Sequence, residues 1–260
     1  MKATTLSKTT WSFAAAALLA ATSVTSVTSV TGATLINLDI QGLAGDTDAI
    51  DYTGSNANGP IASASTTWNH FTAGVNPLTA PNNTLTDLVD STGAATDVDV
   101  EFGSGWAGTY ANNSAGVDNY LFGDRAYTTA GGEGTFTISG LVDGGSYNLA
   151  LIGSSTAGFI TDFTIAGAGT LTATGGSAGT TSNGPLSFNE GVTHVLFENI
   201  VATGGVITFS TKQHIDTGSG LGSSQFGVFS GLQIQAVPEP SSAALLLGLG
   251  SIALILRRRR

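Results

Sequence analysis

The chain has 260 residues, 36 of them glycine, with no cysteine and a formal net charge of −10 at pH 7. The lack of cysteine excludes disulfides, thiol catalysis and cysteine-ligated zinc or iron–sulfur sites. Most basic residues lie in the two terminal segments, so residues 34–236 keep only Arg125 and Lys212 against 17 acids, a formal net charge of −15. Such an acidic domain repels phosphate groups, which argues against nucleic-acid binding.

Residues 1–33 have the organisation of a secretory signal peptide. Lys2 and Lys8 make its start positive, and the apolar run 11–21 is too short to span a membrane. A strand-like run begins at Thr34, so we expect cleavage after Ala33, following export by the Sec machinery. The predicted organisation is a signal peptide at 1–33, a folded domain at 34–236 and a C-terminal segment at 237–260.

The central region predicts an all-β domain. Runs with period-two alternation recur between clusters of Gly, Asn, Asp and Ser, and no sustained amphipathic helical pattern is present. The clearest hairpin joins 134–141 to 146–152 through the turn-forming sequence Val142-Asp143-Gly144-Gly145, whereas 103–123 is expected to be a loop. About ten strands are expected, within 34–40, 65–72, 85–90, 95–102, 134–141, 146–152, 159–167, 169–174, 192–199, 206–211 and 225–235.

Three aromatic residues are candidate sugar contacts, because sugars stack their C–H faces on flat rings. Trp106 and Tyr110 lie in the Gly- and Asn-rich stretch 103–123, where a ring can stand as a platform. Trp68 alternates with His70 in a predicted strand. For Trp68 and Trp106 the alternative is a place in the core.

Two acidic clusters are candidate cation sites. Asp46, Asp48 and Asp51 lie in a loop able to wrap a cation, and a structural Ca²⁺, if the domain binds one, is expected there. Asp97, Asp99 and Glu101 share one face of a predicted strand. For both clusters a solvated acidic surface is the alternative, and no other cofactor is expected.

No catalytic constellation emerges from the sequence. The G-x-S-x-G match at 175–179 lies in a Gly-, Thr- and Ser-rich loop, without the strand and helix that a nucleophile elbow needs. Nothing in the sequence singles out a pair of carboxylates for glycoside hydrolysis. We therefore expect a protein that is not an enzyme.

The last 24 residues contain three features in a fixed order. Residues Val237, Pro238, Glu239 and Pro240 make a rigid extended break, and 241–256 is uncharged and mostly apolar. As a helix, the apolar run reaches about 24 Å, just short of a ~30 Å hydrocarbon core, which predicts a short transmembrane helix. The chain ends in four residues that hold the tail on the cytoplasmic side: Arg257, Arg258, Arg259 and Arg260.

This order of Pro-Glu-Pro, apolar helix and arginines resembles the PEP-CTERM sorting signal of Gram-negative bacteria. The resemblance implies export, transient anchoring in the membrane, and processing by an exosortase at or near the motif. It also implies a final place at the cell surface or in an extracellular matrix, in association with extracellular polysaccharide. A plain C-terminal tail anchor is the alternative.

A second resemblance concerns the domain itself. The segments Phe136 to Leu141, Tyr147-Asn148-Leu149 and Gly231-Leu232-Gln233-Ile234 resemble, in their order, galactose-binding-like and carbohydrate-binding jelly rolls. This implies a single jelly-roll-like β-sandwich, flanked by a signal helix and a transmembrane helix. Our hypothesis is a non-catalytic surface or matrix protein that binds polysaccharide. The alternatives are a purely structural protein without a specific sugar site, and a jelly-roll glycosidase or lyase.

Overall fold

The computed structural model describes residues 34–43, 59–61, 67–73, 83–110, 120–153, 159–175, 188–218, 220 and 222–238. These residues belong to one compact unit, Ala33–Glu239. The predicted signal peptide and the apolar tail lie outside the described residues and stay predictions. Within the described residues, no helix has the length and apolar character needed to cross a membrane.

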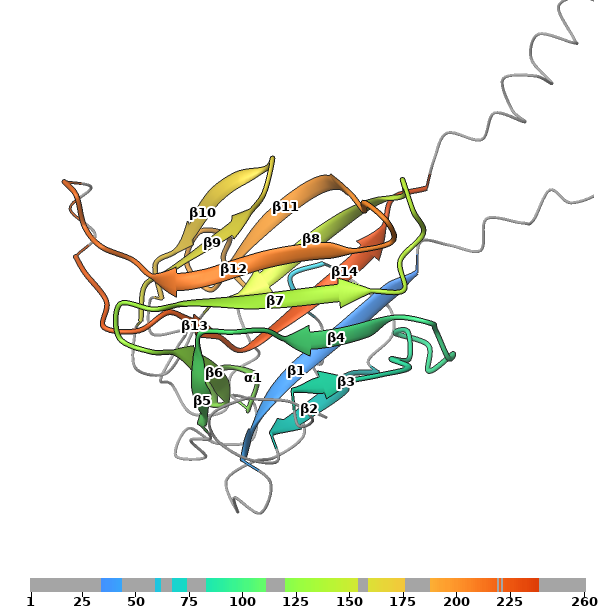
Figure 1. Ribbon diagram of the computed structural model, residues 1–260, viewed down its shortest axis with the longest axis horizontal. Coiled ribbons are helices and arrows are strands. Elements are labelled where there is room, and N and C mark those ends of the chain that lie inside the picture. The colour runs from blue at the N-terminus through green and yellow to red at the C-terminus, as the bar shows by residue number, and fades with distance from the viewer. Residues whose placement is uncertain are drawn as a thin grey trace, which may run out of the picture. The chain divides into compact units, whose positions relative to one another are not determined.

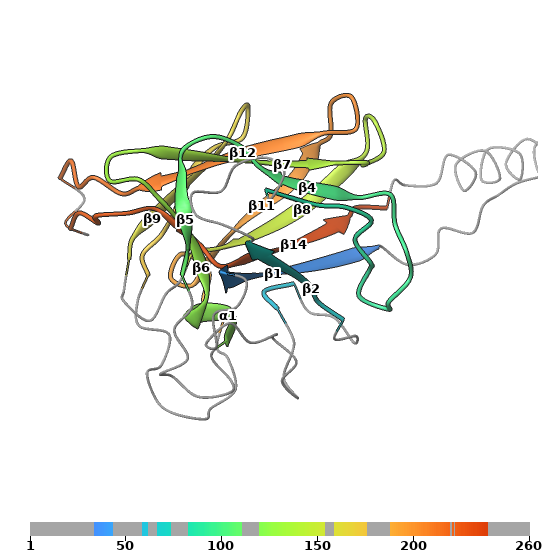
Figure 2. The same ribbon diagram turned by 60° about the horizontal axis from the view of Figure 1, so that its bottom comes forward.

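The domain is a β-sandwich, as predicted, with two large sheets that form its layers (Figures 1 and 2). One sheet has the order β11 (His194–Val201), β8 (Ser146–Ile152), β14 (Gly231–Ala236), β1 (Leu35–Leu43) and β2 (Asn69–Ala73). The other has the order β10 (Gly169–Ala173), β9 (Thr161–Ile165), β12 (Ile207–Gln213), β7 (Glu133–Ser139), β4 (Asp99–Phe102) and β3 (Thr84–Leu85). All described strand pairs are antiparallel except β1 with β2.

A third, small sheet lies at one end of the sandwich and carries the candidate site described below. It contains β13 (Val228–Phe229), β6 (Arg125–Thr128) and β5 (Trp106–Tyr110). A short helix, α1 (Tyr120–Gly123), precedes β6. The stretch 103–123, which the sequence predicted as a loop, therefore contains a strand and a helical turn among its described residues. The sequence did not predict this strand because glycine has a low β-propensity. Packing against neighbouring residues holds β5 in place instead.

The core lies between the two large sheets and is filled by the apolar faces of alternating strands. Phe136 and Ile138 of β7 point into it from one sheet, and Leu149 and Leu151 of β8 from the other, all four fully buried. Phenylalanine rings at its centre meet edge to face, as between Phe102 and Phe136, whose centroids are 4.8 Å apart. Burying each such side chain contributes about 1.5–3 kcal/mol, so these inward faces are the main source of stability.

The predicted hairpin 134–152 is wrong in its pairing. β7 pairs with β12 and β4, whereas β8 pairs with β11 and β14 in the opposite sheet. The turn at 142–145 exists, since the Gly145 N–H donates to the Val142 carbonyl at 3.0 Å, but it carries the chain across the sandwich. Alternation in the sequence identifies the buried face of a strand but does not determine which strand pairs with it. Here β7 and β8 lie in different sheets and turn their apolar faces toward the same core.

Candidate functional site

Both tryptophans proposed as sugar contacts lie in the interior. Trp106 is 3% exposed, packs edge-on against Phe102 and beside Phe229, and donates its indole N–H to the Thr135 carbonyl at 2.7 Å. Trp68 is 5% exposed and belongs to a second apolar cluster. A ring buried to this extent has no face open to a ligand. The core alternative therefore describes both residues, which corrects the expectation that they form sugar platforms.

Tyr110, the third aromatic candidate, lies at the surface because of an irregularity in β5. The pairing of β5 with β6 shifts register between Trp106 and Gly108. An extra residue at such a bulge reverses the alternation that follows it. Trp106 therefore points into the core, whereas Tyr110, at the end of the same strand, is 48% exposed. The register places Tyr110 opposite Arg125 on β6.

These two residues form part of an aromatic pocket of about 200 Å³. Arg125 and Tyr127 are two positions apart on β6 and so lie on the same face of that strand. Phe159 precedes β9 and Phe226 precedes β13, and the ring of Phe226 meets those of Tyr127 and Phe159 edge to face, with centroid distances of 5.9 Å. The described residues that line the pocket are Tyr110, Arg125, Tyr127, Phe159 and Phe226.

The guanidinium of Arg125 is the charged group of this pocket. Its Cζ atom lies over the Tyr110 ring, 4.6 Å from the centroid, and 5.5 Å from the centroid of Phe159. Such cation–π contacts stabilise a buried arginine by about 0.5–2 kcal/mol. Burial lowers the pKa of Arg125, against the attraction of Tyr110, Asp124 and Tyr127, but the ordinary value is so high that the side chain stays charged at neutral pH.

Sequence reasoning named Tyr110 but missed the other four residues of this pocket, which we call the aromatic–arginine pocket. One signal was present. Arg125 is one of two basic residues in a region with 17 acids, and an isolated arginine in an acidic domain is a candidate for a specific contact. Tyr127, Phe159 and Phe226 carry no comparable signal, because the fold brings them together from separate strands.

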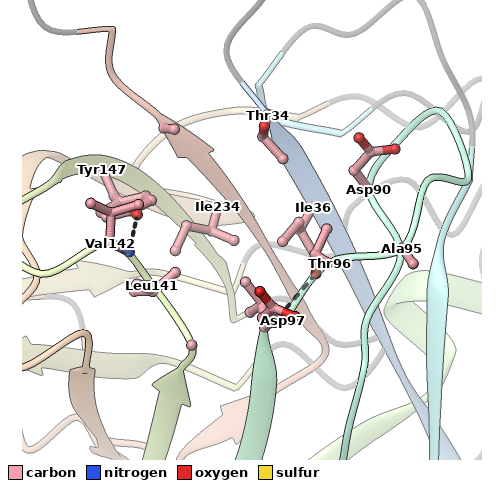
Figure 3. A pocket seen from close by; sticks show the side chains of 13 residues that line it. Thr34, Ile36, Asp90, Ala95, Thr96, Asp97, Leu141, Val142, Tyr147 and Ile234 are labelled. Carbon is pink, nitrogen blue, oxygen red and sulfur yellow. Dashed lines mark hydrogen bonds between the residues drawn. The ribbon is translucent and has the colours of Figure 1, made fainter. Parts of the chain in front are cut away.

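A larger cavity, of about 350 Å³, opens where β1 begins and β14 ends (Figure 3). Two of its polar groups, those of Asp90 and Tyr147, serve local structure. The Asp90 carboxylate accepts hydrogen bonds from Thr92 Oγ1 and from the N–H groups of Thr92 and Ala94, which lower the pKa of Asp90. The Tyr147 hydroxyl accepts a hydrogen bond from the Val142 N–H at 2.9 Å. With these groups already engaged, the cavity is the weaker candidate for a ligand site.

The acidic clusters divide between the described and undescribed parts of the chain. Asp46, Asp48 and Asp51, the proposed Ca²⁺ loop, lie outside the described residues, and that expectation stays a prediction. Asp99 accepts a hydrogen bond from the Asp87 N–H at 2.8 Å, on the face opposite the buried Val100. In the part of the chain that the structure covers, no group of three acids or histidines is placed to hold a metal ion.

A buried polar layer lies on the face of β1 that points away from the main core. Asn37 and Asp39 are fully buried there. The Gln233 side chain of β14 donates to Asn37 Oδ1 at 2.7 Å, and His70 Nδ1 of β2 lies 3.3 Å from Asp39 Oδ2. These contacts join three neighbouring strands, so the layer acts as internal support for the sheet.

The C-terminal end of the domain leads directly into the predicted sorting segment. Pairing of β14 with β8 extends one residue further, since the Val237 N–H donates to the Ser146 carbonyl at 2.8 Å. Pro238, which has no N–H, follows and cannot continue the ladder. Glu239, Pro240 and the four terminal arginines lie outside the described residues.

Comparisons with known proteins bear on this terminal segment. Residues 236–260 match the PEP-CTERM protein-sorting motif. A comparison with curated proteins gives no match. Among solved structures, the crystal structure of an exo-β-1,3-galactanase from Phanerochaete chrysosporium with galactose is similar at 15% identity and a TM-score of 0.25, covering 55% of this chain and 35% of that one. The chain thus spans about a third of the galactanase, a likeness too weak to transfer its activity.

The start of the sorting motif coincides with the end of the last strand of the fold. The motif begins at Ala236, the last residue of β14, so the folded domain ends where the sorting segment starts. The chain is therefore an exported β-sandwich protein that carries a PEP-CTERM sorting signal, the substrate of an exosortase.

Proposed function

We propose that this exported surface protein associates with extracellular polysaccharide and acts by binding, not by turnover. The observation that carries the proposal is the aromatic–arginine pocket. Its rings can pack against the C–H faces of a sugar, and its guanidinium can donate hydrogen bonds to ring or hydroxyl oxygens. Sites that hold small ligands combine apolar walls with a few placed polar groups in this way.

The size of the pocket limits what can enter it. Its volume of about 200 Å³ is smaller than the ~300–1,000 Å³ of pockets that enclose drug-sized molecules. It therefore suits a single ring-sized group, such as an end or branch residue of a longer glycan. The remainder of that glycan would lie on the surface beyond Tyr110, the half-exposed wall of the pocket.

The composition of the pocket wall favours binding over hydrolysis. Most glycosidases use two carboxyl groups, one on each side of the scissile bond. The described residues that line this pocket are four aromatics and one arginine, with no carboxylate among them. A weak similarity to a galactanase does not alter this, and we propose no catalytic step.

The proposal is tested by measuring binding of the exported protein to exopolysaccharide purified from the producing cells. We expect saturable binding by the wild type and at least a tenfold loss in Tyr110→Ala, which is about 1.4 kcal/mol. Leu171→Ala is the matched control, because Leu171 is also an exposed apolar residue, at 38%, but lies on β10 in another sheet. The proposal fails if the wild type does not bind, or if Tyr110→Ala binds as tightly as Leu171→Ala.

A second candidate function is purely structural, without a specific sugar site. It is favoured by the excess of acids in 34–236 and by the exposed Asp97 and Glu101 on one face of the same segment. Divalent cations bind carboxylates of this kind and can bridge them between molecules. Self-association that appears with calcium, disappears with a chelator and occurs without any polysaccharide binding would support this candidate.

A further inference from the structure

We infer that the aromatic–arginine pocket selects acidic sugars, that is, glycan residues that carry a carboxylate. This inference rests on the proposed polysaccharide binding and names the ligand class for the same site. Its basis is the Arg125 side chain, which is 8% exposed, faces the pocket and lacks a full set of partners among the described residues.

Among the residues that the structure describes, most of the hydrogen-bonding capacity of Arg125 is unused. A guanidinium carries five N–H donors in one plane. Within the described part of the chain, its hydrogen bond goes to the Gly123 carbonyl at 3.3 Å, and it forms no ion pair with a carboxylate. Asp124, at the adjacent position, attracts the charge of Arg125. Most of the donors therefore have no partner among the described residues.

The aromatic contacts of Arg125 do not replace such a ligand. Rings attract the guanidinium through its face, as the position of Cζ over Tyr110 illustrates. The N–H donors point outward from the edge of the guanidinium plane and are left free by stacking. A buried charge with free donors is unfavourable unless it is paired. The pocket thus holds the arginine in place, and no carboxylate of the described residues pairs with its edge.

A carboxylate fits this edge better than a hydroxyl does. Its two oxygens accept two parallel N–H bonds from an arginine and neutralise the charge. A sugar hydroxyl accepts at one position and leaves the charge uncompensated. A uronic acid residue joins that carboxylate to an apolar C–H face, which matches the aromatic rings of Tyr110 and Phe159 beside Arg125.

The charge of the rest of the domain determines the conditions of the test. Arg125 and Lys212 are the two basic residues of region 34–236, whose net charge is −15. An acidic glycan is therefore repelled at long range by the domain that binds it at short range. At 0.15 M salt the screening length is about 8 Å, so distant repulsion is reduced while contacts inside the pocket persist.

The test measures binding of the exported protein to polygalacturonate and to its methyl-esterified form at 0.15 M salt without calcium. Esterification removes the charge and keeps the sugar ring. We expect at least tenfold tighter binding to the acid. Arg125→Gln should lose this preference by weakening binding to the acid alone, and Arg125→Lys, which keeps the charge but not the planar fork, should lose most of it. Lys212→Gln removes a positive charge elsewhere and should bind as the wild type does.

The outcomes separate this inference from the function on which it rests. Equal wild-type binding to the acid and its ester overturns acid selection and leaves polysaccharide binding in place. Binding to neither glycan overturns acid selection, and if the native exopolysaccharide is not bound either, the proposed function fails as well. The comparison of the two glycans on the wild type is decisive even if the Arg125 variants do not fold.

Discussion

Replacing Trp106 with alanine should destabilise the domain by about 4–5 kcal/mol. Removal of a buried aromatic side chain costs about 3–5 kcal/mol, and this ring contacts the rings of Phe102 and Phe229 in the core. The hydrogen bond to the Thr135 carbonyl is also lost. The Thr135 carbonyl still accepts a hydrogen bond from the Gly103 N–H at 2.9 Å. Losing the indole hydrogen bond should therefore add only about 1 kcal/mol, the low end of the ~1–3 kcal/mol cost of an unsatisfied buried group.

Urea unfolding followed by far-ultraviolet circular dichroism measures this effect without relying on tryptophan fluorescence. With a denaturant slope of about 2 kcal/mol/M, the midpoint of Trp106→Ala should fall by about 2 M. Tyr110→Ala, four residues away on the same strand, is the matched control and should cost at most about 2 kcal/mol, because its ring is half exposed and its contact with Arg125 contributes about 0.5–2 kcal/mol. Equal midpoint shifts for the two variants would refute the assignment of Trp106 to the core and Tyr110 to the surface.

Two further outcomes are expected from the structure and one from the sorting motif. Gly140 and Gly144 both have φ of +75°. A Cβ added at Gly140 would collide with the Asp97 carbonyl, whereas a Cβ added at Gly144 would have no atom within 4 Å. In urea unfolding, Gly144→Ala should therefore lower the free energy of unfolding by about 1–2 kcal/mol, and Gly140→Ala should lower it by several kcal/mol more. Similar losses in the two variants would contradict the clash. Burial lowers the pKa of His194 to about 4, so the unfolded chain takes up a proton first and stability falls as pH drops from about 6.5 to about 4. His194→Gln should remove up to about 3 kcal/mol of the difference between unfolding at pH 7 and at pH 4.5, and an unchanged difference would count against this burial. Replacing Arg257–Arg260 with glutamine should reduce sorted protein on immunoblots of surface fractions, whereas normal sorting would show that the charges are dispensable.

Alternation in the sequence predicted which faces of the strands are buried, but not which strands pair. In β1, Ile36, Leu38 and Ile40 alternate along the strand and point into the main core. The error at 134–152 arose because two amphipathic runs joined by a four-residue turn fit a hairpin and a crossing between sheets equally well. Long-range pairing decides between them, as when β8 takes β14, some 80 positions later, as its neighbour.

The candidate pocket was less predictable than the fold, for a definite physical reason. Whether Trp106 or Tyr110 is exposed depends on a bulge between them, and a glycine-rich strand gives no sequence signal for the position of that bulge. Phe159 and Phe226 join the pocket only because β9 and β13 lie near β6 in the folded chain. Composition could identify Arg125 as unusual, but only packing places it among aromatic rings.

The pocket and the C-terminal end of the domain lie in different parts of the described fold. β14 ends at Ala236, whose N–H donates to the Thr34 carbonyl at 3.0 Å. The first and last described strands of the domain, β1 and β14, therefore have their outer ends side by side. β14 starts beside β13, which pairs with the strand that carries Arg125, and its six residues then run about 20 Å away from that sheet. Figures 1 and 2 accordingly place β5 and β6 away from the tip of β14. Within the described domain the pocket and Ala236 are therefore separate, so we expect substitutions in the pocket to leave the strand end at Ala236 intact.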